Sequence, residues 1–156
     1  MKSPVPVVSR LVSRVFLGVA LAGCSDPGPA VPAAVDVAIV SEDVRWTATV
    51  RAGGGDGGGL ACGREIHVPV GADVKISIES RDYLCIFSAP GIGLRTFATP
   101  GIPAEYRFRA ERPGTFEIRS DEMCGLPATG ETSGRLVVET AAEFRRWERE
   151  TGRGAR

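Results

Sequence analysis

The residues best suited to chemistry lie in one short stretch, residues 120–125, which reads Ser-Asp-Glu-Met-Cys-Gly. An alternating apolar and polar run, residues 115–119, precedes it, and a loop rich in proline, glycine and threonine, residues 126–134, follows it. Cys124 therefore stands at a corner between a strand and a loop, two residues after Glu122. Such a corner, with thiolate and oxygen ligands, is typical of the metal sites of all-β electron-transfer domains. The stretch indicates the frame of a metal site.

Three further cysteines, Cys24, Cys62 and Cys85, and one histidine, His67, complete the candidate residues. On the alternation of its strand, His67 points away from its apolar neighbours. This favours a surface or second-face histidine, with metal ligation as the alternative. The sequence holds no Ser-His-Asp constellation and no paired-carboxylate motif, so it lends no support to hydrolytic catalysis.

Short strands must position these residues. Runs of alternating or continuous apolar residues, separated by turn residues, predict about eight strands. They span residues 35–40, 44–50, 64–70, 74–79, 83–88, 105–109, 115–119 and 135–139. Residues 89–103 are expected to form a long loop. Short strands at this spacing predict an all-β fold, a β-sandwich or barrel.

Two other segments have a different pattern. The glycine-rich residues 53–59 precede neither a Gly-Lys-Ser/Thr motif nor a helix, so a hairpin tip is favoured over a phosphate-binding loop. Residues 141–150 place Phe144 and Trp147 three positions apart, on one face of a short helix capped by Thr140. Residues 151–156 are expected to be a frayed tail.

Length and composition indicate one globular domain. The chain has 156 residues, 43% of them hydrophobic, and Lys plus Arg equal Asp plus Glu at 19 each. Residues 1–23 hold three of the basic residues and no acid, which leaves 16 basic against 19 acidic residues in the rest of the chain. A mildly acidic body offers no electrostatic support for nucleic-acid binding.

The N-terminus is typical of an export signal. Lys2, Arg10 and Arg14 precede a short apolar run, residues 15–22, which is too short to span a bilayer as a helix. The run ends in Leu-Ala-Gly-Cys, residues 21–24, which resembles the lipobox of bacterial lipoproteins. That resemblance implies a signal peptide over residues 1–23, lipidation of Cys24 and a tether over residues 24–34. The alternative is an ordinary signal peptide with a chance cysteine. We expect residues 35–150 to be a domain on the periplasmic or extracytoplasmic face of the cell envelope, lipid-anchored to a membrane.

The order of these runs resembles the periplasmic domain of cytochrome c oxidase subunit II, a cupredoxin domain with a dinuclear copper centre. The similarity covers roughly residues 46–148. It rests on the strand-and-turn and ligand-bearing segments 65–71 and 80–87, the Pro-Gly turns at 99–101 and 112–116, and a closing helix at 143–147. The resemblance implies a cupredoxin-like Greek-key β-sandwich or barrel. It also implies electron transfer, with respiratory oxidase subunits or cytochrome c as partners.

The ligand positions depart from the family pattern. The family's first histidine falls on Cys85, and its first bridging cysteine falls on Ser120. Cys124 and Glu122, whose backbone carbonyl is the ligand in the family, are kept, whereas the second histidine and the methionine fall near residues 128 and 131, an alanine and a glutamate. A dinuclear copper core needs two bridging thiolates and two imidazoles, so a normal centre is not expected. The resemblance instead implies a degenerate copper site built from Cys85, Cys124 and Glu122.

The cysteines leave alternatives open. In an oxidising compartment Cys85 and Cys124 are expected to form a disulfide. The alternative is a mononuclear Cu(I) or zinc site with both thiolates and an oxygen of Glu122. Cys62 is the odd thiol and pairs with either cysteine or stays free. Trp46 corresponds either to the aromatic point at which electrons enter the family's domain or to a core tryptophan.

Three functions remain. The first is a membrane-anchored subunit II-like domain with an electron-transfer or accessory role in an oxidase. The second is a periplasmic module that binds or delivers copper. The third is a structural or interaction domain with a disulfide in place of metal. At most, the chain would be a non-catalytic electron-transfer subunit of a respiratory cytochrome c oxidase.

Overall fold

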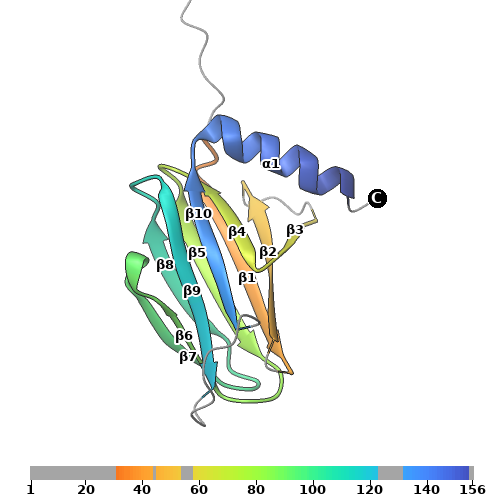
Figure 1. Cartoon of the computed structure of the whole chain (residues 1–156), viewed down its shortest axis with the longest axis vertical. Coiled ribbons are helices and arrows are strands. Elements are labelled where there is room, and N and C mark those ends of the chain that lie inside the picture. Colours follow the sequence, from red (N-terminus) through yellow and green to blue (C-terminus); the bar gives the residue numbers. More distant parts are fainter. Residues whose placement is uncertain (1–30, 44, 54–57, 123–131, 155–156) are drawn as a thin grey trace, which may run out of the picture.

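A computed structural model describes residues 31–43, 45–53, 58–122 and 132–154. Two five-stranded sheets pack face to face (Figure 1). The first sheet has the order β3 (Leu60–Gly63), β2 (Arg45–Ala52), β1 (Ala34–Glu42), β5 (Asp73–Ser80) and β8 (Ala104–Arg109). The second has the order β4 (Glu65–Pro69), β10 (Ser133–Glu139), β9 (Gly114–Glu122), β6 (Cys85–Ala89) and β7 (Leu94–Ala98). The predicted cupredoxin-like all-β sandwich is confirmed.

Pairings between strands distant in sequence close the topology. β1 lies parallel to β5, with Val37 opposite Ile76, and β10 lies parallel to β4, with Val137 opposite His67. Consecutive β1 and β2 are antiparallel, as are β6 and β7. Two parallel strands cannot be joined by a tight hairpin, so a long stretch of chain separates β1 from β5 and β4 from β10. Each sheet therefore contains strands from both halves of the chain.

The core follows the alternation seen in the sequence. In β1, Val35, Val37 and Ile39 are buried while the intervening residues are half-buried or exposed. β5 repeats this pattern, and side chains from the two inner faces fill the interior. Trp46 from the first sheet meets Phe87 from the second edge to face, with ring centroids 6.1 Å apart.

Two expectations are wrong. Residues 94–98 form β7 rather than part of a loop, because Leu94 and Ala98 point into the core and the short helix η1 (Pro90–Ile92) turns the chain back beside β6. Residues 60–63, which no expected strand covered, form β3 beside β2. Both strands are short edge strands, which carry weak periodic signals.

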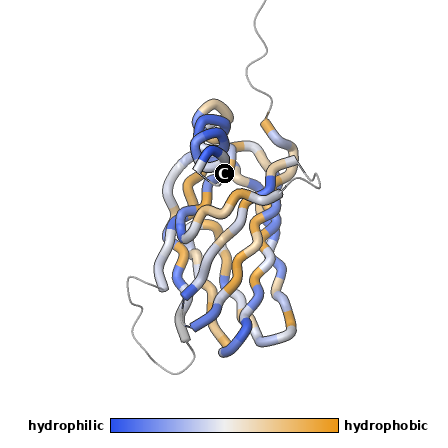
Figure 2. Tube along the Cα trace, turned by 90° about the vertical axis from the view of Figure 1, so that its right-hand side faces the viewer, coloured by the Kyte–Doolittle hydropathy of each residue, from blue (hydrophilic) through white to orange (hydrophobic). Residues whose placement is uncertain are grey.

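The helix α1 (Ala141–Gly154) extends beyond the expected end, so residues 151–154 are helical rather than frayed. It begins with a capping box: the Thr140 amide donates to Glu143 Oε2 at 3.0 Å, and the Glu143 amide donates to Thr140 Oγ1 at 3.3 Å. Phe144 is buried, and α1 packs against β3 and β4. The rest of the helix is largely hydrophilic (Figure 2).

Among the described helices none is long and apolar enough to cross a bilayer.

Gly134 provides a test of the core at the start of β10. A Cβ at this position would overlap the Trp46 ring and the Arg64 carbonyl oxygen. We expect Gly134→Ala to lower the free energy of unfolding by about 1–3 kcal/mol, measured by chemical denaturation. Gly152→Ala is the control: its Cβ would lie 3.6 Å from Leu60 Cδ2, an ordinary contact, and alanine favours the helix. Equal stability of Gly134→Ala and the parent would contradict the packing described.

Candidate functional site

One end of the sandwich collects the chemical groups singled out by the sequence, and we call it the Cys85 end. It comprises the ends of β1, β5 and β9 and the beginnings of β6 and β10, with Ser41, Ser80, Cys85, Ser120 and Thr132 as its buried polar or thiol side chains. Cys85 pairs with Glu122 in the β6–β9 register, and Ser120 pairs with Phe87. The structure therefore brings together Cys85 and the segment that carries Glu122.

Four side chains with hydroxyl groups are buried at this end. Ser41, Ser80, Ser120 and Thr132 are the buried polar side chains of the described ranges, each no more than 5% exposed. The Ser80 hydroxyl donates to the Tyr83 carbonyl, and the Ser120 amide donates to the Thr132 carbonyl at 2.9 Å. Sequence patterns did not single out Ser41, Ser80 or Thr132, because each serine or threonine alone is unremarkable in a strand end.

Cys85 is 3% exposed and carries a free thiol. Its sulfur lies 4.0 Å from the Ala98 carbonyl oxygen, at the outer limit of a sulfur hydrogen bond. The predicted partner, Cys124, lies outside the described residues, as do the positions matched to the family's second histidine and methionine. Of Glu122 only the backbone is described, and it ends β9 beside Cys85.

The described donors do not fit a dinuclear copper centre. His67 is the only histidine of the chain and pairs with Val137, which pairs in turn with Thr115. Thr115 lies seven residues before Glu122 on β9, about 23 Å along the strand. No group of three or more His, Cys, Asp or Glu side chains within the described ranges could hold a metal ion. Among the described residues, this end supplies the Cys85 thiol at the position of the first histidine and the Ser120 hydroxyl at the position of a bridging thiolate.

Trp46 lies in the core at 1% exposure, which matches the core alternative. Its indole N–H donates to the Thr132 carbonyl at 2.9 Å. The ring therefore forms part of the wall behind the Cys85 end. A role as the point at which electrons enter stays a prediction.

Cys62 lies on β3 in the other sheet, and its thiol is also free. A Cys62–Cys85 disulfide, one of the pairings left open, is therefore not formed. The Cys62 thiol donates to the Ala48 carbonyl at 3.3 Å, and burial raises its pKa to about 11. This thiol is a weak nucleophile at neutral pH.

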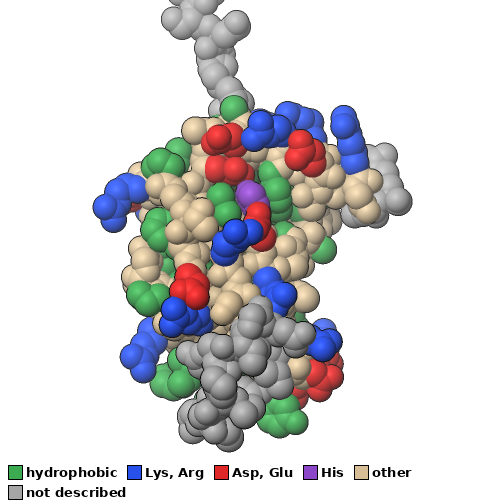
Figure 3. Space-filling model, viewed as in Figure 1, with side chains coloured by type: hydrophobic (Ala, Val, Ile, Leu, Met, Phe, Trp, Pro, Cys, Tyr) green, Lys and Arg blue, Asp and Glu red, His purple; other side chains and the backbone are tan. Residues whose placement is uncertain are grey.

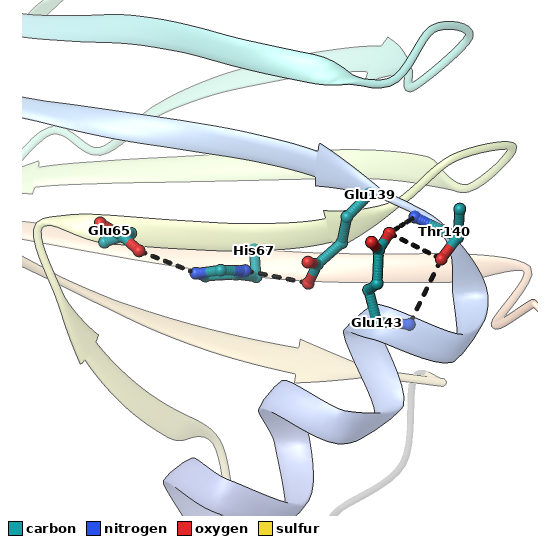
Figure 4. Close-up of polar contacts among 5 residues, drawn as sticks. All are labelled: Glu65, His67, Glu139, Thr140 and Glu143. Carbon is teal, nitrogen blue, oxygen red and sulfur yellow. Dashed lines mark hydrogen bonds and ion pairs between the residues drawn. The ribbon is translucent and has the colours of Figure 1, made fainter.

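His67, in the middle of β4, is held between two carboxylates (Figure 4). Nδ1 lies 2.9 Å from Glu139 Oε1, and Nε2 lies 3.2 Å from Glu65 Oε1. Both ring nitrogens are therefore engaged, and His67 is a structural residue here rather than a ligand. Glu65 and His67 are two residues apart on one strand and therefore share a face, so the sequence could have predicted this contact but not the one with Glu139.

Strand order, the inward Cys85 and the hydroxyl-lined end together define a cupredoxin-like β-sandwich. Residues 32–139 match the family described as cytochrome C oxidase subunit II, periplasmic domain. The chain belongs to this family, which is associated with copper.

Relatives support the assignment. The chain is 35% identical over 86 residues to cytochrome c oxidase subunit 2 of Thermostichus vulcanus, covering 55% of this chain and 26% of that protein. It is 29% identical over 83 residues to the alternative cytochrome c oxidase subunit 2 of Bradyrhizobium diazoefficiens, covering 53% of this chain and 30% of that protein. The chain thus spans less than a third of these curated relatives.

Solved structures share the fold. The periplasmic domain of subunit II of cytochrome oxidase from Bradyrhizobium japonicum has a TM-score of 0.62 at 19% identity, covering 81% of this chain and 97% of that one. A subunit II domain in a mixed disulfide intermediate with a thioredoxin-like protein has a TM-score of 0.57 at 19% identity, covering 76% and 94%. A chain of a heme-copper terminal oxidase dimer has a TM-score of 0.53 at 23% identity, covering 69% and 65%.

The raised pKa of the Cys62 thiol gives a reactivity test. In the folded protein at pH 8 we expect Cys62 to react with a thiol reagent at least about tenfold more slowly than in the unfolded chain, because the thiolate is the nucleophile. The rate should climb as the pH rises toward 11. Peptide mapping after timed alkylation at pH 8 measures this, and labelling of Cys62 at the unfolded rate would contradict its burial.

Proposed function

We propose that this chain is a membrane-anchored, subunit II-like domain in which a pair of thiols, Cys85 and Cys124, replaces the dinuclear copper centre. Its place is that of an accessory or electron-transfer component of a respiratory oxidase. The observation that carries the proposal is the pairing of Cys85 with Glu122, two residues before Cys124 in the chain. Family membership supplies the oxidase context.

Chain geometry supports the thiol pair. Directly paired antiparallel residues have Cα atoms about 4.5–5.5 Å apart, and two further residues span at most about 7 Å. A disulfide needs Cα atoms about 4.4–6.8 Å apart, so Cys124 is close enough in the chain to reach Cys85. A subunit II domain similar to this chain is found in a mixed disulfide with a thioredoxin-like protein, which supports thiol chemistry in domains of this fold.

The described donors argue against the copper chemistry of the family. Ser120, buried at 5% exposure, occupies the position of a bridging thiolate. A neutral hydroxyl does not offset the charge of a copper ion as a thiolate does. Electron transfer by this chain would then require a non-standard copper site built from Cys85, Cys124 and Glu122.

Membrane attachment is the other part of the proposal. Cys24 would carry the lipid, and residues 24–33 would link it to the first strand, which begins at Ala34. Dual acylation holds a protein on a bilayer stably, whereas a single chain binds only marginally. The body of the domain would then lie on the extracytoplasmic face.

A peptide map of the full chain purified from membranes under non-reducing conditions tests both parts. The Cys85 thiol is free in the structure, so the proposed cross-link requires oxidation in the cell envelope. After that oxidation we expect a Cys85–Cys124 cross-linked peptide, a free Cys62 and an N-terminal Cys24 peptide with the added mass of acyl chains. The Cys62→Ser variant is the matched control and should keep the cross-link, whereas Cys85→Ser should release a titratable Cys124 thiol.

If Cys85 and Cys124 are instead free thiols that bind Cu(I) tightly without colour, this result would contradict the disulfide and favour a role in copper delivery. Free thiols without metal uptake would overturn the thiol-pair proposal. An unmodified Cys24 in the membrane fraction would overturn the anchor alone.

A further inference from the structure

Helix α1 and the tail after it are basic, whereas the rest of the domain is acidic. Residues 141–156 hold five basic and three acidic residues, and residues 24–140 hold 11 basic and 16 acidic residues. Figure 3 shows basic side chains, with acidic ones between them, along the top of the molecule, where α1 lies in the same view. This charge belongs neither to the proposed thiol pair nor to the family's copper centre.

The exposed arginines of α1 form one stripe. An α-helix turns by about 100° per residue, so Arg146, Arg149 and Arg153 lie within about 60° of one another around the helix axis. All three side chains are exposed. Phe144, whose buried ring attaches the helix to the core, lies on the opposite side of the helix. These three residues, which we call the arginine stripe, therefore face away from the sandwich.

The acidic residues of α1 leave the stripe with a positive charge. Glu143 and Glu150 flank it on one side only. Glu143 is engaged in the capping box: hydrogen bonds from Thr140 hold the pKa of its carboxyl below its usual range, with a smaller contribution from the charge of Arg146. The exposed face thus carries three guanidinium groups beside one carboxylate that has no role in the cap.

The first strand begins at the same end of the sandwich as α1 (Figure 1). The turn between β4 and β5 holds both segments. The Val70 amide donates to the Glu139 carbonyl at 2.8 Å, two residues before α1. The Asp73 amide donates to the Ala33 carbonyl at 3.1 Å, one residue before β1. A tether that precedes β1 would therefore reach the sandwich beside α1, away from the Cys85 end.

We propose that the arginine stripe binds the anionic lipid headgroups of the membrane to which the chain is anchored. This inference rests on the lipid anchor of the proposed function. Residues 24–33 span at most about 35 Å, so the anchor would keep α1 close to the headgroups.

The chemistry of the stripe fits this partner. Guanidinium groups bind phosphate oxygens through paired hydrogen bonds, and each basic residue near an anionic bilayer adds to binding. Three arginines alone bind a membrane weakly, but a tether makes the contact intramolecular and raises the effective concentration of the surface. The Cys85 end would then face away from the bilayer, toward partners in the extracytoplasmic space.

Arginine modification on vesicles tests this contact. The full chain purified from membranes would be inserted into preformed vesicles of phosphatidylcholine, alone or with an equal part of phosphatidylglycerol, treated with phenylglyoxal and mapped by mass spectrometry. We expect the stripe, relative to Arg95 on β7, to react about fivefold more slowly on the anionic vesicles, the scale of one basic residue at a charged surface. The difference should vanish in about 1 M salt, where charges are screened within about 3 Å.

Energy transfer from tryptophan to dansyl-labelled headgroups separates the stripe from the general charge of the chain. In the parent we expect more transfer on anionic than on neutral vesicles, because Trp147 on α1 would lie near the bilayer. Replacing all three arginines of the stripe with glutamine, which supports a helix about as well, should abolish this difference. The matched control should keep it. That control removes the same charge from three exposed arginines outside α1: Arg81→Gln, Arg95→Gln and Arg119→Gln.

The mass of the Cys24 peptide in the same sample separates this inference from the anchor. With an acylated Cys24, equal modification of the stripe on both vesicles would overturn the inference, leave the anchor standing and favour an acidic protein surface as the partner of α1. A difference in energy transfer that persists without the stripe would overturn it as well. With an unmodified Cys24 the anchor fails, and the same comparison decides the contact by itself: a protected stripe supports it, and an equally reactive stripe overturns it.

Discussion

Trp46 is the side chain on which the two sheets depend at the Cys85 end. It rises from β2 of the first sheet, meets Phe87 of the second edge to face, and donates its indole N–H to the Thr132 carbonyl beside β10. A buried N–H without a partner costs about 1–3 kcal/mol, so this bond fixes the direction of the ring. The ring in turn requires a glycine at position 134.

Around this tryptophan, the buried polar side chains of the described residues carry hydroxyl groups rather than imidazoles or carboxylates. The Ser80 hydroxyl donates to the Tyr83 carbonyl, and Ser120 is buried at the position that the resemblance assigns to a bridging thiolate. Buried hydroxyls are tolerated when they are hydrogen-bonded, and they carry no charge that would need a metal ion. On the proposed function, this chain keeps the family fold without the family's dinuclear copper centre.

Much of the fold was predictable because its central strands alternate apolar and polar residues over five or more positions. β3 and β7 were not, since four or five residues at an edge give little periodicity. The sequence pattern also predicted too short a helix α1. Its last turn contains Gly152 and Arg153 but no apolar residue of the buried face, so the helical periodicity ends before the helix does.

The candidate residues show the same division between local and distant information. Cys85 and Ser120 could be placed from the resemblance alone. The His67 cluster could not, because it depends on the parallel pairing of β4 with β10, which brings Glu139 beside a residue 72 positions away. Such a contact leaves no local pattern in a single sequence.

Copper stoichiometry tests the central claim most directly, namely that this member of the family lacks a dinuclear copper centre. The full chain would be reduced, loaded with copper, freed of loosely bound metal and analysed for copper per chain and for visible absorption. The account predicts fewer than two copper ions per chain and no purple thiolate-to-copper absorption. Two copper ions per chain with that absorption would contradict it.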